Sequence, residues 1–179
     1  MLTNGGFDAL LLGGRSGSGK SSLGFEVSAQ LQLASVAHCF IEGDFLDQAF
    51  PAPSGDPSRT LLTEDNLAVL WRNYSARGYH RLIYTNTVSV LEADLVGRAM
   101  AGEVRFVGVL LTADDATVRQ RLEYREVGSQ LEAHVARSAA MAEMLEETCP
   151  PWVIRVPTDG RELIDIAREV VELTGWKGL

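Results

Sequence analysis

The feature that most constrains this chain is a run of glycines and small residues that ends in Lys20 and Ser21. Residues 14–21, Gly-Arg-Ser-Gly-Ser-Gly-Lys-Ser, match the phosphate-loop template G-x-x-x-x-G-K-[ST] at every fixed position. The apolar run at 9–12 predicts a buried strand before the loop, and the apolar spacing over 20–33 predicts a helix after it. A strand, a glycine loop and a helix in this order are the context that the motif requires.

The residue types in this loop suit the binding of a nucleoside phosphate. Glycine allows the positive φ angles that turn backbone N–H groups toward phosphate oxygens, and the start of the next helix adds partial positive charge. We expect Lys20 to reach the β- and γ-phosphates of ATP and the Ser21 hydroxyl to bind Mg²⁺. The predicted nucleotide-binding residues are Gly14, Arg15, Ser16, Gly17, Ser18, Gly19, Lys20, Ser21, Ser22 and Thr158.

Composition narrows the class of protein. With 179 residues, the chain is long enough to bury a core, and we expect one domain over residues 1–179. No apolar run approaches the roughly 20 residues of a membrane span, and the first residues do not follow a signal-peptide pattern. We therefore expect a cytoplasmic protein with no membrane partner and with reduced Cys39 and Cys149. The net charge of −8 argues against binding to extended nucleic acid.

Apolar strands and amphipathic helices alternate along the chain. This alternation predicts an α/β fold with three αβα layers around a five-stranded parallel sheet, whose ligands gather at the carboxyl ends of the strands. A proline-rich loop is expected at 51–57. The expected strands cover 7–13, 36–41, 81–84, 104–111 and 152–156, and the expected helices cover 20–33, 63–77, 89–101, a segment capped by Thr112, 130–147 and 161–173.

Two acidic residues follow the second expected strand. Glu42 and Asp44 are two positions apart, so in an extended chain they project to the same side. We expect Glu42 to hold Mg²⁺ through its water and Asp44 to accept a proton from a substrate hydroxyl. The alternative is that Asp44 caps a short helix over 45–50, with Glu42 in solvent. The next strand end, 85–87, offers neutral hydrogen-bonding groups.

Arginines are the second group of candidate catalytic residues. Arg121 and Arg125 lie four residues apart and share one face of the predicted helix. We expect one of them to stabilise the charge that develops on a transferred phosphoryl group, with Arg137 as a further candidate. The alternative is a solvated helix surface on which Glu123 and Glu126 pair with these arginines.

The phosphate loop, the acidic strand end and the arginine-rich stretch together resemble small-molecule kinases of the nucleoside-monophosphate-kinase fold. Shikimate kinase, gluconate kinase and chloramphenicol phosphotransferase are the most similar types. In that group the second strand ends in D-x-D or a similar pair, which Glu42 and Asp44 match with one conservative change. Residues 118–125 resemble the group's R-L-x-x-R before its lid, and 153–176 look like its last strand, adenine-side loop and closing helix.

The resemblance implies an adenylate-kinase-like P-loop NTPase fold with a lid near 119–137. The chain departs from the group at 126–129, where the lid is short. The function that the resemblance implies is an ATP-dependent phosphotransferase, dependent on Mg²⁺, that acts on a hydroxyl of a metabolite, nucleoside or antibiotic. The catalytic residues would be Lys20, Asp44, Arg121 and Arg125.

Two alternative functions fit the same motifs. A nucleotide-binding resistance protein of the tunicamycin-resistance type would sequester its ligand without forming ADP. A nucleoside-monophosphate kinase would phosphorylate a nucleotide, although the acidic strand end and the few substrate-side arginines count against it. We expect a small-molecule acceptor and either a monomer or a homodimer, and the sequence leaves the acceptor and the choice between ATP and GTP open.

Overall fold

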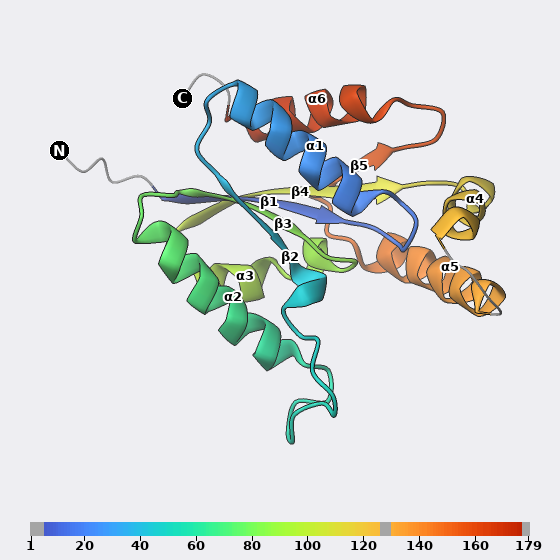
Figure 1. Ribbon diagram of the computed structural model, residues 1–179, viewed down its shortest axis with the longest axis horizontal. Helices are drawn as coiled ribbons and strands as arrows, with labels where there is room; N and C mark the ends of the chain where they lie inside the picture. Colours follow the sequence, from blue (N-terminus) through green and yellow to red (C-terminus); the bar gives the residue numbers. More distant parts are fainter. Residues whose placement is uncertain (1–5, 126–129, 177–179) are drawn as a thin grey trace.

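Five parallel strands form the centre of the computed structural model, which describes residues 6–125 and 130–176 (Figure 1). Their order in the sheet is β2-β3-β1-β4-β5, so the strand before the phosphate loop lies in the middle. This arrangement confirms the five-stranded parallel sheet that the sequence predicts. The strands are β1 (Phe7–Gly13), β2 (Cys39–Glu42), β3 (Arg81–Thr85), β4 (Val104–Thr112) and β5 (Ile154–Pro157).

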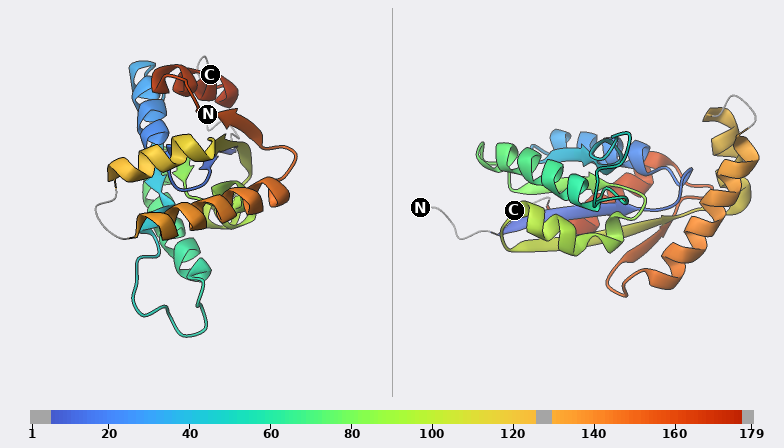
Figure 2. Two further views of the ribbon diagram at one scale, coloured as in Figure 1. Left: turned by 90° about the vertical axis from the view of Figure 1, so that its right-hand side faces the viewer. Right: turned by 90° about the horizontal axis from the view of Figure 1, so that it is seen from below.

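Helices cover both faces of the sheet, which gives the predicted three layers. α1 and α6 lie together on one face, and α2 and α3 lie together on the other (Figure 1). α4 and α5 lie beyond the carboxyl ends of the strands (Figures 1 and 2). The helices are α1 (Lys20–Leu33), α2 (Thr60–Ser75), α3 (Ala93–Met100), α4 (Asp115–Arg125), α5 (Leu131–Thr148) and α6 (Leu163–Thr174), with short 3₁₀ turns η1 (Gly43–Phe45) and η2 (Ser89–Leu91).

The apolar run in β1 is buried on both sides, because successive side chains of a strand point to opposite faces. Leu11 belongs to the core on the α2 and α3 side, where Trp71 is also buried. Leu10 and Leu12 belong to the core on the α1 and α6 side, together with Val27. β1 is apolar at consecutive positions because its alternate side chains enter two different cores, one on each face of the sheet.

The register of the sheet brings the ends of several strands to one edge. Thr85 pairs with both Leu12 and Glu42, and Gly13 pairs with Leu110. The segments that leave β1, β2, β3 and β4 therefore start side by side at the carboxyl edge of the sheet. Ligands of open α/β sheets bind at this edge.

The start of α2 differs from the sequence-based expectation. The helix begins at Thr60 instead of Thr63, and Arg59 precedes it with a φ of 60°. The Asp56 carboxylate accepts a hydrogen bond from the Leu62 N–H at 3.0 Å and so caps the first turn, three residues before the expected start. Thr63 instead lies inside the helix and donates its hydroxyl proton to the Arg59 carbonyl at 3.0 Å.

Two further expectations about helix starts were wrong. Thr112 does not cap α4, because it still pairs with Pro157 in the sheet as the last residue of β4. The cap is Asp114, whose carboxylate accepts a hydrogen bond from the Thr117 N–H at 2.6 Å. The helix expected over 89–101 is divided into η2 and α3.

In the described parts of the chain, no helix has the length and hydrophobicity to cross a membrane.

Candidate active site

The phosphate loop has the backbone conformation that its glycines predict. Gly14, Gly17 and Gly19 have φ angles of 143°, 84° and 97°. A Cβ at position 14 would lie 2.7 Å from the Leu111 carbonyl oxygen and 2.7 Å from Ser18 Oγ, so this position requires glycine for space as well as for conformation. α1 starts directly after Gly19 without a side-chain cap, so its first N–H groups face the loop. This is the geometry of an anion site at a helix N-terminus.

Lys20 lies between the loop and the acidic side of the site. Its Nζ donates hydrogen bonds to the carbonyl oxygens of Gly14 at 2.8 Å and Arg15 at 3.2 Å. Its charge also acts on Asp44, whose pKa it lowers. The ammonium group is therefore within electrostatic reach of the carboxylate while it is held at the loop. Ser21 follows in the first turn of α1, and its role as a Mg²⁺ ligand stays a prediction.

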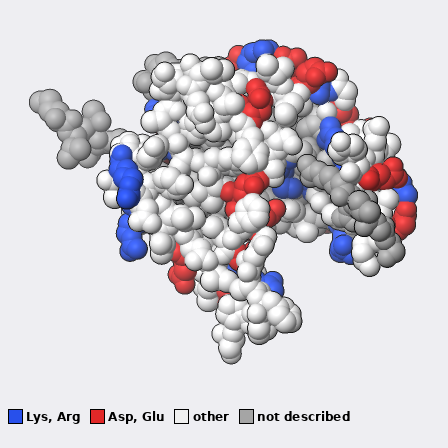
Figure 3. Space-filling view, viewed as in Figure 1, with Lys and Arg blue, Asp and Glu red and all other residues white. Residues whose placement is uncertain are grey.

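Asp44 lies in η1, directly after the end of β2. Acidic side chains gather near the middle of the face that Figure 3 shows. Partial burial is the main reason that the pKa of its carboxyl is raised above the usual range. Lys20 opposes this shift, whereas the charges of Glu42 and Asp47 add to it. The alternative of a capped helix over 45–50 is wrong, because the turn ends at Phe45 and has no side-chain cap.

Glu92 joins this acidic side and was missed by the sequence analysis. Asn86 Nδ2 donates a hydrogen bond to Glu92 Oε2 at 3.2 Å. Burial raises the pKa of Glu92, hydrogen bonding with Tyr84 and Asn86 lowers it, and the charges of Asp47 and Asp44 raise it. No local motif marks Glu92, since it reaches the site from the segment between η2 and α3.

Tyr84 is a buried residue next to Glu92 and within electrostatic range of Asp44. Its side chain is fully buried, and its hydroxyl lies beside Glu92 and Asn86, with which it interacts. A Cβ at Gly43 would lie 2.6 Å from the Tyr84 hydroxyl oxygen. The glycine between Glu42 and Asp44 is thus required by the close approach of a tyrosine.

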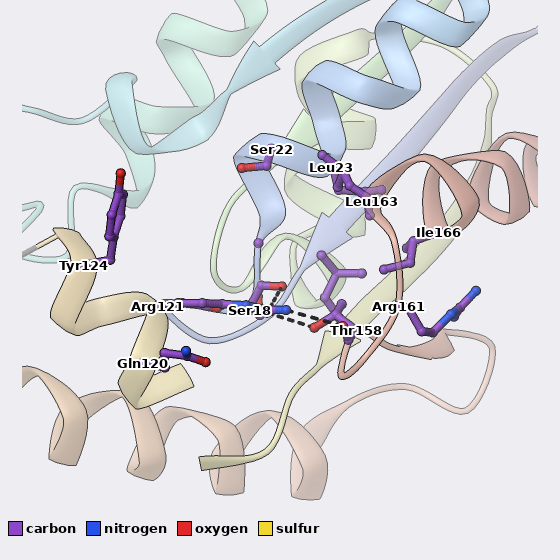
Figure 4. A pocket seen from close by; sticks show the side chains of 13 residues that line it. Ser18, Ser22, Leu23, Gln120, Arg121, Tyr124, Thr158, Arg161, Leu163 and Ile166 are labelled. Carbon is purple, nitrogen blue, oxygen red and sulfur yellow. Dashed lines mark hydrogen bonds between the residues drawn. The ribbon is translucent and has the colours of Figure 1, made fainter. Parts of the chain in front are cut away.

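A cavity of about 470 Å³ opens on the other side of the phosphate loop (Figure 4). The start of α1, the inner face of α4 and the segment between β5 and α6 surround it. Its lining is largely apolar with a few polar groups, which suits the adenosine part of a nucleotide. The predicted residues Ser22 and Thr158 both line it. The lining residues are Gly17, Ser18, Gly19, Ser22, Leu23, Leu111, Gln120, Arg121, Tyr124, Thr158, Arg161, Leu163 and Ile166.

Arg121 connects the loop to the last strand at this cavity. Its Nη1 donates to Thr158 Oγ1 at 3.0 Å and, at longer range, to the carbonyl oxygens of Gly17 (3.3 Å) and Ser18 (3.4 Å). Its Nη2 donates to the Thr158 carbonyl at 3.3 Å (Figure 4). The structure therefore brings Arg121, Thr158 and the phosphate loop together.

For the other predicted arginines, Arg125 and Arg137, the structure describes no side-chain contact with the phosphate loop. Arg125 ends α4, and its side chain lies outside the described part of the chain, as do lid residues 126–129. Arg137 is exposed on α5, and its role stays a prediction. Arg119 pairs with Glu123 and Glu132 on the surface, away from the loop.

Two predicted loop residues serve as anchors through their side chains. Arg15 is 5% exposed, and its Nη1 pairs with Asp115 at 2.6 Å, so its backbone is what faces the phosphate site. Ser16 Oγ forms a hydrogen bond with His134 Nε2 at 2.8 Å, and Ser138 Oγ donates to the Ser16 carbonyl at 2.8 Å. These contacts fasten the loop to α4 and α5.

Ser18 is fully buried, and its Oγ has no hydrogen-bond partner among the described residues. It lies against Gly14, where it fills the inside of the loop.

The oxygen-bearing side chains near the loop fit a Mg²⁺ ion that is bound together with nucleotide phosphates. Within residues 6–125 and 130–176, no group of three or more His, Cys, Asp or Glu side chains is arranged to hold a metal. Mg²⁺ does not need such a cage, because it keeps several waters and binds through one or two oxygen ligands together with substrate phosphates. Ser21 and Glu42, the predicted ligands, and Asp44 all carry hard oxygen atoms of this kind.

No known family model matches this chain, and no curated protein matches it by sequence. Solved structures do match. A gluconokinase from Sinorhizobium meliloti 1021 is 19% identical with a TM-score of 0.59, over 94% of this chain and 91% of that one. APS kinase from Mycobacterium tuberculosis, in complex with AMPPNP and APS, is 18% identical with a TM-score of 0.56, over 93% and 96% of the two chains.

Shikimate kinase from Acinetobacter baumannii, in complex with shikimate, is 14% identical with a TM-score of 0.57, over 97% of this chain and 96% of that one. At these identities the likeness concerns the fold, and it extends over nearly the whole length of each chain. It confirms the resemblance that the phosphate loop, Glu42 and Asp44 indicate. The chain has the nucleoside-monophosphate-kinase-like fold of the P-loop small-molecule kinases.

Proposed function

We propose that this protein transfers the γ-phosphoryl group of ATP to a hydroxyl group of a small molecule. The observation that carries the proposal is the position of Lys20. Its Nζ contacts the Gly14 carbonyl at the phosphate loop, and its charge acts on Asp44 at the end of β2. A cation between a nucleotide cavity and an acidic strand end is what in-line phosphoryl transfer requires.

The nucleotide would bind across the loop. The N–H groups around Gly17 and Gly19 would receive the phosphates, and the cavity beside Leu23 and Ile166 would receive adenosine. Ser21 and Glu42 would hold Mg²⁺, which neutralises charge on the β- and γ-phosphates when it is bound.

Asp44 would act as the base. Its carboxylate accepts the proton of the acceptor hydroxyl while that oxygen bonds to the γ-phosphorus. The bond from the γ-phosphorus to the bridging oxygen breaks, and ADP leaves with its electrons. A raised pKa makes the Asp44 carboxylate a stronger base than an exposed aspartate.

Arg121 would stabilise the charge on the transferred group. Its guanidinium now donates to the Gly17 and Ser18 carbonyls at 3.3–3.4 Å, and these long contacts exchange readily for a phosphate oxygen. We assign Arg125 the same role, one turn further along α4. The likeness to structures of a gluconokinase, an APS kinase and a shikimate kinase supports this class of reaction.

The direct test is ADP release from Mg·ATP across a panel of sugars, nucleosides, nucleotides and hydroxylated antibiotics, with Lys20→Ala as the blank. Acceptor-dependent ADP release in the wild type alone would support the proposal. Phosphorylation confined to nucleotides would identify a nucleoside-monophosphate kinase instead. Tight binding of a panel compound without ADP formation would identify a sequestering protein.

A further inference from the structure

Two side chains of α5 hold both polar groups of one phosphate-loop residue, Ser16. His134 Nε2 forms a hydrogen bond with Ser16 Oγ at 2.8 Å, and Ser138 Oγ donates to the Ser16 carbonyl at 2.8 Å. His134 and Ser138 are four residues apart, so they lie on the same face of α5. Figure 1 shows α5, in orange, next to the loop that follows β1. Ser16 is thus held at two points by one face of a distant helix.

The hydrogen bond of Ser138 is not the usual one for a hydroxyl inside a helix. Such a hydroxyl commonly donates to the carbonyl four residues earlier, as Thr148 does to Met144 in the same helix at 2.7 Å. Ser138 is 2% exposed and donates its proton to the phosphate loop instead. The contact therefore sets the direction in which the Ser16 carbonyl points.

Residues 15–18 form a tight turn within the phosphate loop. The Ser18 N–H donates to the Arg15 carbonyl at 3.1 Å, and Gly17, the third residue of the turn, has a φ of 84°. A positive φ at this position is typical of a type II turn. Types I and II differ mainly in the direction of the central peptide, which here joins Ser16 to Gly17. The carbonyl that Ser138 holds is therefore the group whose direction distinguishes the two turns.

The direction of this carbonyl also determines where the Gly17 N–H points. The Ser16–Gly17 peptide is trans, so its C=O and its N–H point in opposite directions. The N–H is therefore directed away from Ser138. Among the described residues, it donates to no backbone carbonyl. A Cβ on Gly17 would lie 3.0 Å from Val118 Cγ1, so α4 packs closely against this residue and also restricts the peptide.

We propose that His134 and Ser138 are positioning residues for the nucleotide. They hold the Ser16–Gly17 peptide in the orientation that aims the Gly17 N–H at a phosphate oxygen. This inference rests on the proposed function, in which the N–H groups around Gly17 receive the phosphates. A flip of the peptide to the type I orientation would replace this donor with a carbonyl oxygen, which repels a phosphate. Through the loop, α5 thereby controls how tightly the phosphates bind.

The test compares AMPPNP with adenosine, because only AMPPNP places phosphates at the loop. Binding of each, with Mg²⁺ present, is measured by titration calorimetry in the wild type, Ser138→Ala and Ser138→Thr. The matched control is Thr148→Val, which removes a hydroxyl that bonds within α5. Urea unfolding of each variant shows that it is folded under the conditions of the titration.

We expect Ser138→Ala to weaken AMPPNP binding about tenfold and to leave adenosine binding within about twofold, since a hydrogen bond to a charged group contributes on this scale. Ser138→Thr, which keeps the hydroxyl, and Thr148→Val should each bind AMPPNP within about threefold of the wild type. Unchanged AMPPNP binding in Ser138→Ala, or an equal loss for AMPPNP and adenosine, would overturn the inference.

The second contact is tested independently with two variants of His134. His134→Ala should weaken AMPPNP binding about threefold without an effect on adenosine, because the neutral hydrogen bond that it removes is weaker. His134→Gln should restore most of that loss, since its amide can still reach Ser16 Oγ. Equal AMPPNP affinity in His134→Ala and the wild type would remove His134 from the proposal.

None of these titrations needs an acceptor, so the two proposals can fail separately. AMPPNP binding that depends on Ser138, in a protein that transfers no phosphoryl group, would support this inference and contradict the phosphotransferase. Transfer to an acceptor with unchanged AMPPNP affinity in Ser138→Ala would support the phosphotransferase and overturn this inference alone.

Discussion

Arg121 Nη1 lies 3.0 Å from Thr158 Oγ1, and this hydrogen bond joins α4 to the residue after the last strand, beside the cavity next to the phosphate loop. Thr158 Oγ1 in turn donates to the Thr112 carbonyl at 3.2 Å, and the same arginine contacts the Gly17 carbonyl. The guanidinium on α4 therefore contacts the loop and Thr158 directly, and Thr158 links it to the end of β4. If a phosphate oxygen replaced the loop carbonyls as acceptor, Arg121 could still keep its hydrogen bond to Thr158.

Replacement of Arg121 by alanine is expected to lower kcat by about 10³-fold, because an arginine that stabilises phosphoryl charge in cis contributes on this scale. Arg121→Lys should restore little, since a lysine cannot reproduce the forked contacts. Steady-state ADP release measures both. Arg119→Ala is the matched control on the same helix, where the arginine pairs with Glu123 and Glu132. An equal loss in the two alanine variants would contradict the role of Arg121.

Gly14→Ala is expected to abolish nucleotide binding. The added Cβ would lie 2.7 Å from the Leu111 carbonyl oxygen at a φ of 143°, so the loop could not keep its shape. Gly55→Ala is the control, because position 55 also has a positive φ (87°) but no atom within 4 Å of the added Cβ. That control should cost about 1–2 kcal/mol of stability and leave binding intact. Titration of a fluorescent ATP analogue distinguishes them, and binding retained in Gly14→Ala would refute the argument.

Gly43→Ala is expected to lower the free energy of unfolding by about 1–3 kcal/mol, because its Cβ would lie 2.6 Å from the Tyr84 hydroxyl oxygen. Tyr84→Phe removes that oxygen, so the double variant Gly43→Ala/Tyr84→Phe should recover part of the loss. Urea unfolding of the four proteins forms a double-mutant cycle. Strictly additive effects would show that the two residues do not interact.

Glu92→Gln is expected to stabilise the protein at pH 7 more than at acidic pH. Burial raises the pKa of Glu92 in the folded state, so the ionised carboxylate opposes folding. This opposition is absent below the ordinary glutamate pKa and complete above the raised value, so the gain from Gln should grow as the pH rises through that window. Urea unfolding against pH measures it, with Glu103→Gln, at an exposed carboxylate directly before β4, as the matched control. A gain that shrinks with pH would show that the pKa is lowered.

Asp44→Asn is expected to lower kcat by about 10²–10⁴-fold with nucleotide affinity nearly unchanged, because the amide cannot accept the hydroxyl proton. In the wild type, the raised pKa of Asp44 should shift the acid limb of the kcat/KM profile above that of an ordinary aspartate. The pH–rate profile and ATP titration check these two points. Unchanged kcat in Asp44→Asn would remove it from the mechanism.

Local patterns in the sequence were sufficient for the phosphate loop and the sheet. The loop motif is contiguous from Gly14 to Ser21, and the apolar runs mark the central strands directly. Helix starts were harder to predict from the sequence. The cap of α2 is Asp56, which accepts a hydrogen bond from an N–H six residues later in the chain. Side-chain chemistry alone does not distinguish it from Thr63, which has a more typical position before acidic residues.

Long-range contacts within the site could not be predicted at all. His134 and Ser16 are separated by 118 residues, and Arg15 and Asp115 by 100. Glu92 lies within electrostatic range of Asp44, and β2 and β3 are neighbours in the sheet. These contacts depend on the order of strands in the sheet, which hydrophobic periodicity does not encode.

The most direct measurement of the central claim is the fate of the γ-phosphate. Purified protein is incubated with Mg·ATP and the acceptor panel, and ADP, inorganic phosphate and phosphate esters are quantified together by mass spectrometry and phosphorus NMR. ADP and one phosphate ester are expected in equal amounts in the wild type, and neither is expected in Lys20→Ala. ATP that stays intact while bound, or ADP that appears with inorganic phosphate in place of an ester, would contradict it.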